Sequence, residues 1–288
     1  MEPIINDGYL VSQSDYQVKV KYFENGRIEA CLKVVKPLVQ DMMHAASNYP
    51  AAYRPLRVGL AKTPEELEEA KEANRARAAQ RAKQAVRHLC MAFDADRLLT
   101  LTYRENQEDR ALFYKHFTKF LRLVRKSYPE FASVAVPELQ DRGAWHMHLA
   151  IKGWVRISII RQCWYKALGG TGKEEGDQTP GQVNIQGPKG RASVNRTWKA
   201  TKLAAYISKY ISKSFEDVET GLHRYFASRN LPKVPPSFRF WITGQNMAQA
   251  AFNLVRDLER RYDLHPDFGM YLSDDETCFW LNGRNACT

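Results

Sequence analysis

The stretch Thr201-Lys-Leu-Ala-Ala-Tyr-Ile-Ser-Lys-Tyr-Ile-Ser-Lys-Ser-Phe215 contains one tetrapeptide, Tyr-Ile-Ser-Lys, written twice in succession. It has no Pro or Gly, and its apolar residues recur at intervals of three and four, which predicts a helix. At about 100° per residue, one side of this helix is apolar and is expected to be buried. The neighbouring side carries two phenols and three ammonium groups, namely Lys202, Tyr206, Lys209, Tyr210 and Lys213.

Two interpretations of this polar side are open. Tyrosines one turn apart are usually an aromatic pair at the rim of a core, with lysines as ordinary solvated charge. Alternatively, phenols among ammonium groups are suited to attack on a phosphate, because a nearby cation stabilises the phenolate or neutralises the phosphate. A second group of residues further upstream favours the second interpretation.

The upstream group lies in two segments that are predicted to be strands, Phe131–Gln140 and Trp145–Ile151. Between them stands Asp141-Arg142-Gly143-Ala144, a sequence typical of a turn. The two strands are therefore expected to form a hairpin centred on Arg142, although Pro137 and the possibility of a bulge leave the register open.

With that register, three side chains that can bind a metal converge. Glu138 lies opposite His146, because the two residues are equally distant from the turn. His146 and His148 are two apart on a strand and therefore project from the same face. Gln140 shares this face by parity and is a reserve ligand.

Two imidazoles and one carboxylate suit a divalent metal that keeps positions open for water or a substrate oxygen. The same set suits zinc, although no Cys joins it. Alternating polar residues are also common on half-buried strands, so His-x-His alone is compatible with a purely structural role. The opposed Glu138 and the large flanking side chains of Trp145 and Leu149 favour a metal site, for which Mg²⁺ or Mn²⁺ is expected.

Composition names a class of partner and excludes several classes of protein. Among 288 residues, 43 Lys and Arg stand against 32 Asp and Glu, a formal net charge of +11. Such an excess indicates a polyanionic partner, most often nucleic acid. The five scattered cysteines predict neither a zinc knuckle nor a disulfide framework and fit a reducing cytoplasm. The first residues lack the pattern of a secretory signal, and no segment is long and apolar enough to span a bilayer.

The rest of the sequence is organised around these motifs. Residues 1–60 are expected to form a strand-rich extension with a hairpin turn at Asn25-Gly26. Residues 61–230 are expected to form the core, led by a long helix that begins at Thr63-Pro64 and becomes basic in its second half. Residues 231–288 are expected to add a helix and a hairpin at the C-terminal end. No P-loop sequence is present, so nucleotide binding is not supported.

Three motifs in this order resemble the HUH endonucleases that start rolling-circle replication. The first is the apolar strand Leu98–Tyr103, and the second is His146-Met147-His148 with an acidic residue upstream. The third is the helix with Lys three residues after each Tyr. The doubled tetrapeptide resembles the two-tyrosine branch, which includes replication proteins of single-stranded DNA phages and some plasmid initiators. The resemblance covers about residues 97–230.

The resemblance implies an α+β fold with a central, mainly antiparallel five-stranded sheet flanked by helices, similar to an RRM-like core. It implies that a tyrosine attacks a phosphodiester of single-stranded DNA, leaving a 5′-phosphotyrosine bond and a free 3′-OH, and that strands are rejoined at termination. Tyr206 and Tyr210 would be the nucleophiles, with Lys209 and Lys213 as their cations. The Glu-His-His group would hold the divalent metal.

The resemblance also implies partners: single-stranded or hairpin origin DNA, and the helicase and polymerase of a bacterial host, in its cytoplasm and without a membrane. Two alternatives stay open. A two-tyrosine transposase would use the same chemistry, although such enzymes often carry a Cys-rich zinc module. A basic nucleic-acid-binding regulator would bind without cleavage and would form no covalent protein–DNA species.

Overall fold

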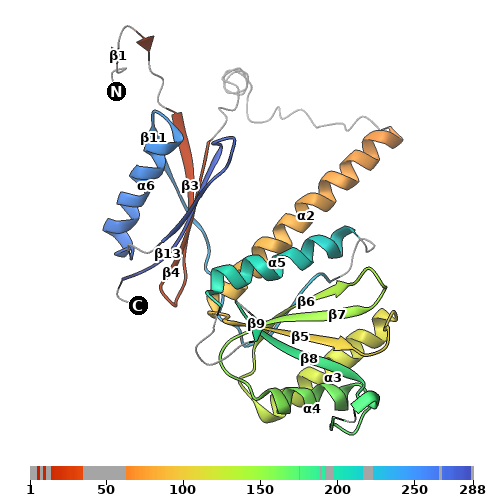
Figure 1. The fold of residues 1–288 in the computed structure, drawn as a ribbon. Helices are drawn as coiled ribbons and strands as arrows, with labels where there is room; N and C mark the ends of the chain where they lie inside the picture. Colours follow the sequence, from red (N-terminus) through yellow and green to blue (C-terminus); the bar gives the residue numbers. More distant parts are fainter. Residues whose placement is uncertain are drawn as a thin grey trace, which may run out of the picture. The chain divides into compact units, whose positions relative to one another are not determined.

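A computed structural model of the chain describes residues 5–6, 9–10, 14–34, 63–174, 176–188, 190–191, 198–216, 223–265 and 268–286. The chain divides into two compact units (Figure 1). The central unit is Pro64–Val234, and the flanking unit joins Met1–Thr63 with Pro235–Thr288. Much of the predicted extension 1–60 lies outside the described residues.

The central unit is built on a six-stranded sheet with the order β10-β6-β7-β5-β8-β9, in which all neighbours are antiparallel. The predicted α+β fold with a mainly antiparallel sheet flanked by helices is confirmed. One strand more than expected is present, because two-residue strands pair at both edges. The strands are β5 (Arg97–Tyr103), β6 (Ser133–Leu139), β7 (Trp145–Ile151), β8 (Gly181–Gly187), β9 (Gly190–Arg191) and β10 (Phe226–Ala227).

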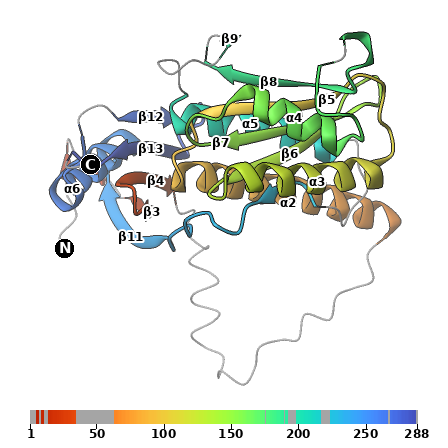
Figure 2. The ribbon, with the colours of Figure 1, turned by 90° about the horizontal axis from the view of Figure 1, so that it is seen from below.

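One face of this sheet is covered by α3 (Arg110–Ser127) and α4 (Ile157–Ala167), which lie on the near side in Figure 2. Helix α3 begins where the Asp109 carboxylate accepts hydrogen bonds from two backbone N–H groups of its first turn. Its apolar stripe packs with α4 and the odd-numbered residues of β5 and β7 into one core. Phe113, Phe120 and Trp164 are completely buried there.

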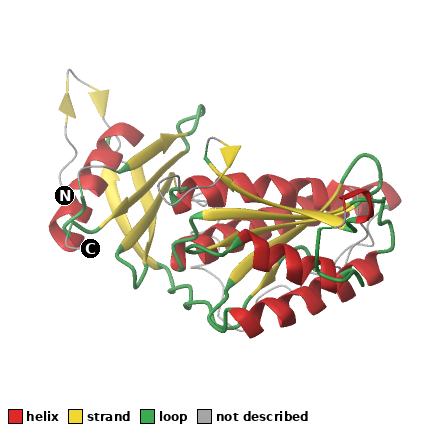
Figure 3. Ribbon diagram, turned by 60° about the horizontal axis from the view of Figure 1, so that its bottom comes forward, coloured by secondary structure: helices red, strands yellow, loops and turns green. Residues whose placement is uncertain are grey.

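The other face is covered by α2 (Pro64–Ala92) and α5 (Ala200–Glu216), so that the sheet has helices on both sides (Figure 3). The predicted apolar stripe of α5 is confirmed, because Leu203, Ala204, Ile207 and Ile211 are all buried. They pack against even-numbered residues of β5, β6 and β7 and against α2. Burial of each Leu or Ile stabilises this docking by about 1.5–3 kcal/mol.

The flanking unit is a five-stranded antiparallel sheet of order β11-β3-β4-β13-β12 with α6 (Met247–Tyr262) against one face (Figure 1). The predicted β3–β4 hairpin is confirmed, and Gly26 in its turn has a φ of 76°. The sequence named no partner for either end of the chain; the structure pairs β3 with β11 and β4 with β13. The strands are β3 (Ser14–Tyr22), β4 (Arg27–Val34), β11 (Phe238–Gly244), β12 (Gly269–Leu272) and β13 (Cys278–Arg284).

A two-stranded piece, β1 (Ile5–Asn6) with β2 (Tyr9–Leu10), precedes this sheet. Of the helices in the described part of the chain, none combines the length and the apolar character needed to cross a membrane.

Candidate active site

The β6–β7 hairpin positions the three predicted metal ligands. Its turn needs Gly143, whose φ of 83° lies in the left-handed region that glycine adopts without strain. The turn is closed by a hydrogen bond of 3.0 Å from the Gln140 N–H to the Ala144 carbonyl. Glu138 is the Cα partner of His146. The predicted register of this hairpin is therefore confirmed.

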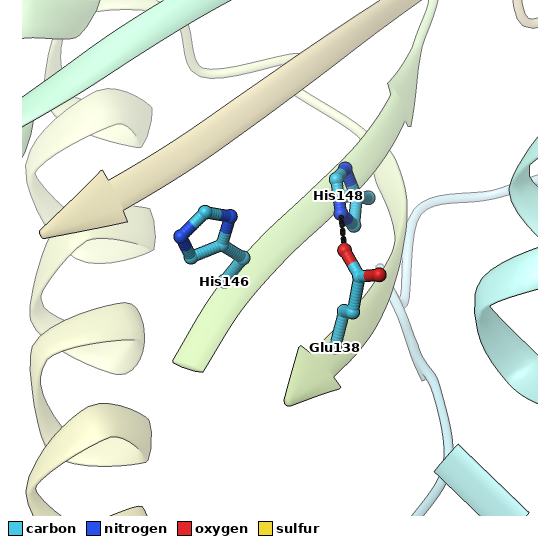
Figure 4. A group of neighbouring side chains, drawn as sticks. All are labelled: Glu138, His146 and His148. Atoms are coloured by element: carbon cyan, nitrogen blue, oxygen red, sulfur yellow. Dashed lines mark hydrogen bonds and ion pairs between the residues drawn. The ribbon is translucent and has the colours of Figure 1, made fainter. Parts of the chain in front are cut away.

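The three ligands form one buried group, in which their potential ligand atoms lie within 4.8 Å of one another (Figure 4). His148 Nε2 is 2.8 Å from Glu138 Oε2. On the other side of the ring, His148 Nδ1 is 3.1 Å from the hydroxyl of Thr100, the residue opposite on β5. Glu138 and His146 are each 7% exposed and His148 is 5% exposed. This group is called the Glu-His-His group below.

Two properties of His146 fit a metal ligand. Its Nε2 is buried and has no hydrogen-bond partner among the described residues, a costly state for a polar atom in a protein interior. Burial, followed by the neighbouring His148, lowers the pKa of His146 to about 4. The imidazole is therefore neutral at pH 7 and keeps a lone pair to offer. One carboxylate and two neutral imidazoles can hold a divalent metal, and this donor set does not select one ion.

The reserve ligand is differently placed. Gln140 Oε1 accepts a hydrogen bond of 3.1 Å from the Arg142 guanidinium at the turn. Glu138, His146 and His148 thus form the Glu-His-His group without it.

Helix α5 brings both tyrosines to the Glu-His-His group. Its apolar stripe faces the sheet, so the adjoining polar side lies beside β7. The ring of Tyr210 stacks on the ring of His148, with centroids 3.7 Å apart and an interplanar angle of 9°. The Tyr210 hydroxyl donates a hydrogen bond of 3.1 Å to the Tyr206 hydroxyl. Burial, then this hydrogen bond and the charge of Glu138, raise the pKa of Tyr210 above its usual range.

Lys209 and a residue that the sequence analysis did not single out surround Tyr206. Lys209 Nζ lies 5.6 Å from the centroid of the Tyr206 ring. Trp198 packs on that ring at 5.3 Å, and its indole N–H is fixed by a hydrogen bond to the Gln186 carbonyl. The side chain of Lys213 is outside the described residues, although the helix backbone continues beyond it.

Thr100 and Trp198 carried weak signals in the sequence. Thr100 lies in the apolar strand that was identified as a motif, and its polar side chain alternates with leucines. Trp198 is the aromatic residue just before the tyrosine helix. Their positions depend on strand pairing and helix docking across the sheet, which local patterns do not specify.

Fold and site together define an α+β protein with a candidate metal site beside two adjacent tyrosines. Residues 96–215 match the family model for the replication-associated protein ORF2. The matched segment contains every predicted site residue, from Glu138 to Lys213. The match supports a replication initiator family and DNA as the interacting molecule. Neither the curated proteins nor the solved structures that were compared gave a match.

Proposed function

We propose that this chain is a replication initiator of the two-tyrosine HUH type, which nicks single-stranded DNA at a rolling-circle origin. The observation that carries the proposal is the stacking of Tyr210 on His148, with Tyr206 hydrogen-bonded to Tyr210. Two potential nucleophiles thus lie against a group that can hold a divalent metal. A purely structural aromatic pair would not need this neighbour.

In the proposed reaction, the hydroxyl oxygen of a tyrosine attacks the phosphorus of a phosphodiester in single-stranded DNA. The bond from phosphorus to tyrosine forms, and the bond from phosphorus to O3′ breaks. The phenol loses its proton, and the leaving O3′ takes one up. The products are a 5′-phosphotyrosine and a free 3′-OH. A later 3′-OH can reverse the step and rejoin the strands, because one phosphodiester has been exchanged for another.

The Glu-His-His group would hold Mg²⁺ or Mn²⁺ through Glu138, His146 and His148. When bound, this ion supplies Lewis-acid polarisation of the scissile phosphate and charge neutralisation. Thr100 orients the His148 ring through Nδ1, as hydrogen-bonded neighbours commonly do for metal-binding histidines. The neutral state of His146 leaves it ready to bind at physiological pH.

The two tyrosines are not equivalent, and we assign the first attack to Tyr206. Tyr206 accepts the hydrogen bond from Tyr210, so its oxygen is the one whose negative charge that bond stabilises. Lys209 adds a cation near the same ring. Tyr210 is instead held neutral by burial and by the carboxylate of Glu138. It would take the second attack, aided by Lys213 three residues later.

The test is a search for the covalent intermediate. The protein is incubated with fluorescent single-stranded and hairpin oligonucleotides and Mn²⁺, then denatured and run on a gel. A protein-linked fluorescent band, absent in Tyr206→Phe/Tyr210→Phe and in chelator, is expected, and peptide mapping identifies the linked tyrosine. Binding without any such band, across a library of sequences, would favour the non-catalytic regulator.

The match to a replication-associated family favours an initiator over a two-tyrosine transposase. The partners would be origin DNA, in single-stranded or hairpin form, and the helicase and polymerase of a bacterial host, in its cytoplasm. An initiator should leave a 3′-OH that a polymerase extends, whereas a transposase should join the linked strand to a new target.

A further inference from the structure

The sheet of the flanking unit has two unlike faces. Apolar residues at alternate positions, including Val18, Ile28 and Leu32, are buried with Leu254 and Leu258 of α6 on the first face. The positions between them project to the second face, here called the outer face. In the described part of this unit, α6 is the one helix, and it packs against the first face.

Strand register places the side chains of the outer face in rows. One row crosses all five strands, about 19 Å at the usual spacing between strands. It runs in the order Tyr271, Trp280, Cys31, Lys19 and Arg239. The next row runs in the order Cys278, Lys33, Gln17 and Trp241. Aromatic rings thus lie toward both edges of the face, with cations between them.

These aromatic side chains are accessible to a ligand. Trp241 and Tyr271 are each 58% exposed, and Trp280, which lies opposite Tyr271, is half-buried. Large aromatic residues rarely face water without a partner, and rings of this kind are typical stacking platforms for nucleic-acid bases.

The charge of the outer face is one-sided. Lys19, Lys33 and Arg239 are exposed between the rings. Glu29 is the one carboxylate that a described strand side chain contributes to this face, and it is buried and paired across the strands with Lys21. The face therefore presents cations and rings to a ligand, which complements a chain of phosphates that carries bases.

We propose that the outer face is a second binding site for single-stranded DNA. Bases stack on Trp241, Tyr271 and Trp280, while Lys19 and Lys33 contact phosphates. A duplex is a poor ligand because its paired bases cannot turn toward the rings of a sheet face. The choice of DNA over RNA rests on the proposed function. The site shares no residue with the Glu-His-His group or the tyrosine helix.

The test measures binding by the full chain in chelator, so that no cleavage interferes. The probe is fluorescein-labelled oligodeoxythymidine, followed by anisotropy. Trp241→Ala/Tyr271→Ala should weaken binding about tenfold or more, since two stacked bases are lost. Phe252→Ala is the matched control, because Phe252 is 61% exposed on α6, and it should leave the affinity unchanged.

A charge variant tests the phosphate contacts separately. Lys33→Ser should reduce the slope of log affinity against log salt by about 0.7, the value for one phosphate contact with a single strand. Arg260→Ser, which removes an exposed cation from α6, should leave the slope unchanged. Trp241→Phe keeps a ring at that position and should retain most of the affinity, which guards against a misfolded alanine variant.

The outcomes separate this site from the proposed function. If the aromatic double variant binds as tightly as the parent chain while covalent adduct still forms with Mn²⁺, the outer face is not a DNA site and the initiator proposal stands. If the variant loses affinity but the parent never forms adduct, the binding site stands alone. Equal loss for Trp241→Phe and Trp241→Ala would refute stacking, and a tighter site for RNA or for duplex DNA would refute the choice of ligand.

Discussion

Removing the hydroxyl of Tyr210 tests the assignment of roles to the two tyrosines. Tyr210→Phe keeps the ring that stacks on His148 at 3.7 Å and deletes only the donor of the hydrogen bond to Tyr206. If Tyr206 attacks first, that donor stabilises the negative charge that develops on its oxygen. We therefore expect Tyr210→Phe to slow the first adduct without abolishing it.

The size of the effect follows from the change in charge of the acceptor. A hydrogen bond to a neutral group contributes about 0.5–1.5 kcal/mol, and one to a charged group about 1.5–3 kcal/mol. The bond exists before reaction, so only the difference, about 1–2 kcal/mol, accelerates attack. This predicts about a five- to thirtyfold slower reaction. The lower end is expected, because both rings are half-buried and water can replace the donor.

The assay is single-turnover adduct formation on a short oligonucleotide with Mn²⁺, quenched at timed intervals and resolved on a denaturing gel. Tyr103→Phe is the control: its hydroxyl lies 3.1 Å from His116 Nδ1 on the opposite face of the sheet, and its loss should leave the rate unchanged. Complete loss of adduct in Tyr210→Phe, with Tyr210 as the linked residue in the parent, would reverse the assignment. An unchanged rate would remove the hydrogen bond from the mechanism.

Other predictions follow from the same site. His146→Ala or His148→Ala should abolish adduct and Mn²⁺ binding but change oligonucleotide affinity less than about twofold, since many phosphate contacts supply affinity; Glu138→Ala should be less complete, because a neighbouring amide or water can substitute. Full nicking by the His146/His148 double variant in chelator would exclude a metal. Tyr206→Phe and Tyr210→Phe should each keep some cleavage but fail in complete replication cycles, and the double variant should form no adduct; loss of all adduct from Tyr206→Phe alone would make this a one-tyrosine enzyme. The folded pKa of His146, about 4, lies below its usual value of 6.5, so the unfolded chain binds this proton more readily. Stability of the metal-free chain should therefore fall by up to about 3 kcal/mol as pH drops from about 6.5 to 4, and urea titrations should show no such slope from this residue in His146→Ala. Affinity for single strands should fall steeply with added salt in anisotropy titrations, and a salt-insensitive interaction would contradict a phosphate-rich ligand.

The features that sequence predicted best are those fixed by local periodicity. The opposition of Glu138 and His146 follows from counting outward from a turn, and the buried stripe of α5 follows from a period of 3.6. Both rules act within one hairpin or one helix, so no knowledge of the remaining fold was needed.

The contacts that sequence did not predict are those between distant elements. Thr100 meets His148 only because β5 pairs with β7, and Trp198 meets Tyr206 only because its backbone is anchored before α5. Strand β11 was overlooked, although Phe240 and Ile242 alternate with outward residues, because a Pro-rich segment before it suggested a boundary. The stacking of Tyr210 on His148 likewise needs the docked helix.

The pairing of both chain ends in one sheet sets an order of events during synthesis. Strands β3 and β4 leave the ribosome first, and their partners β11 and β13 follow only after the whole central unit. At the usual rates of translation, the roughly 250 residues between the end of β4 and the end of β13 take about 12–50 s. Throughout that time the β3–β4 hairpin waits with both edges unpaired and open to wrong partners, while the central unit can already complete its own core.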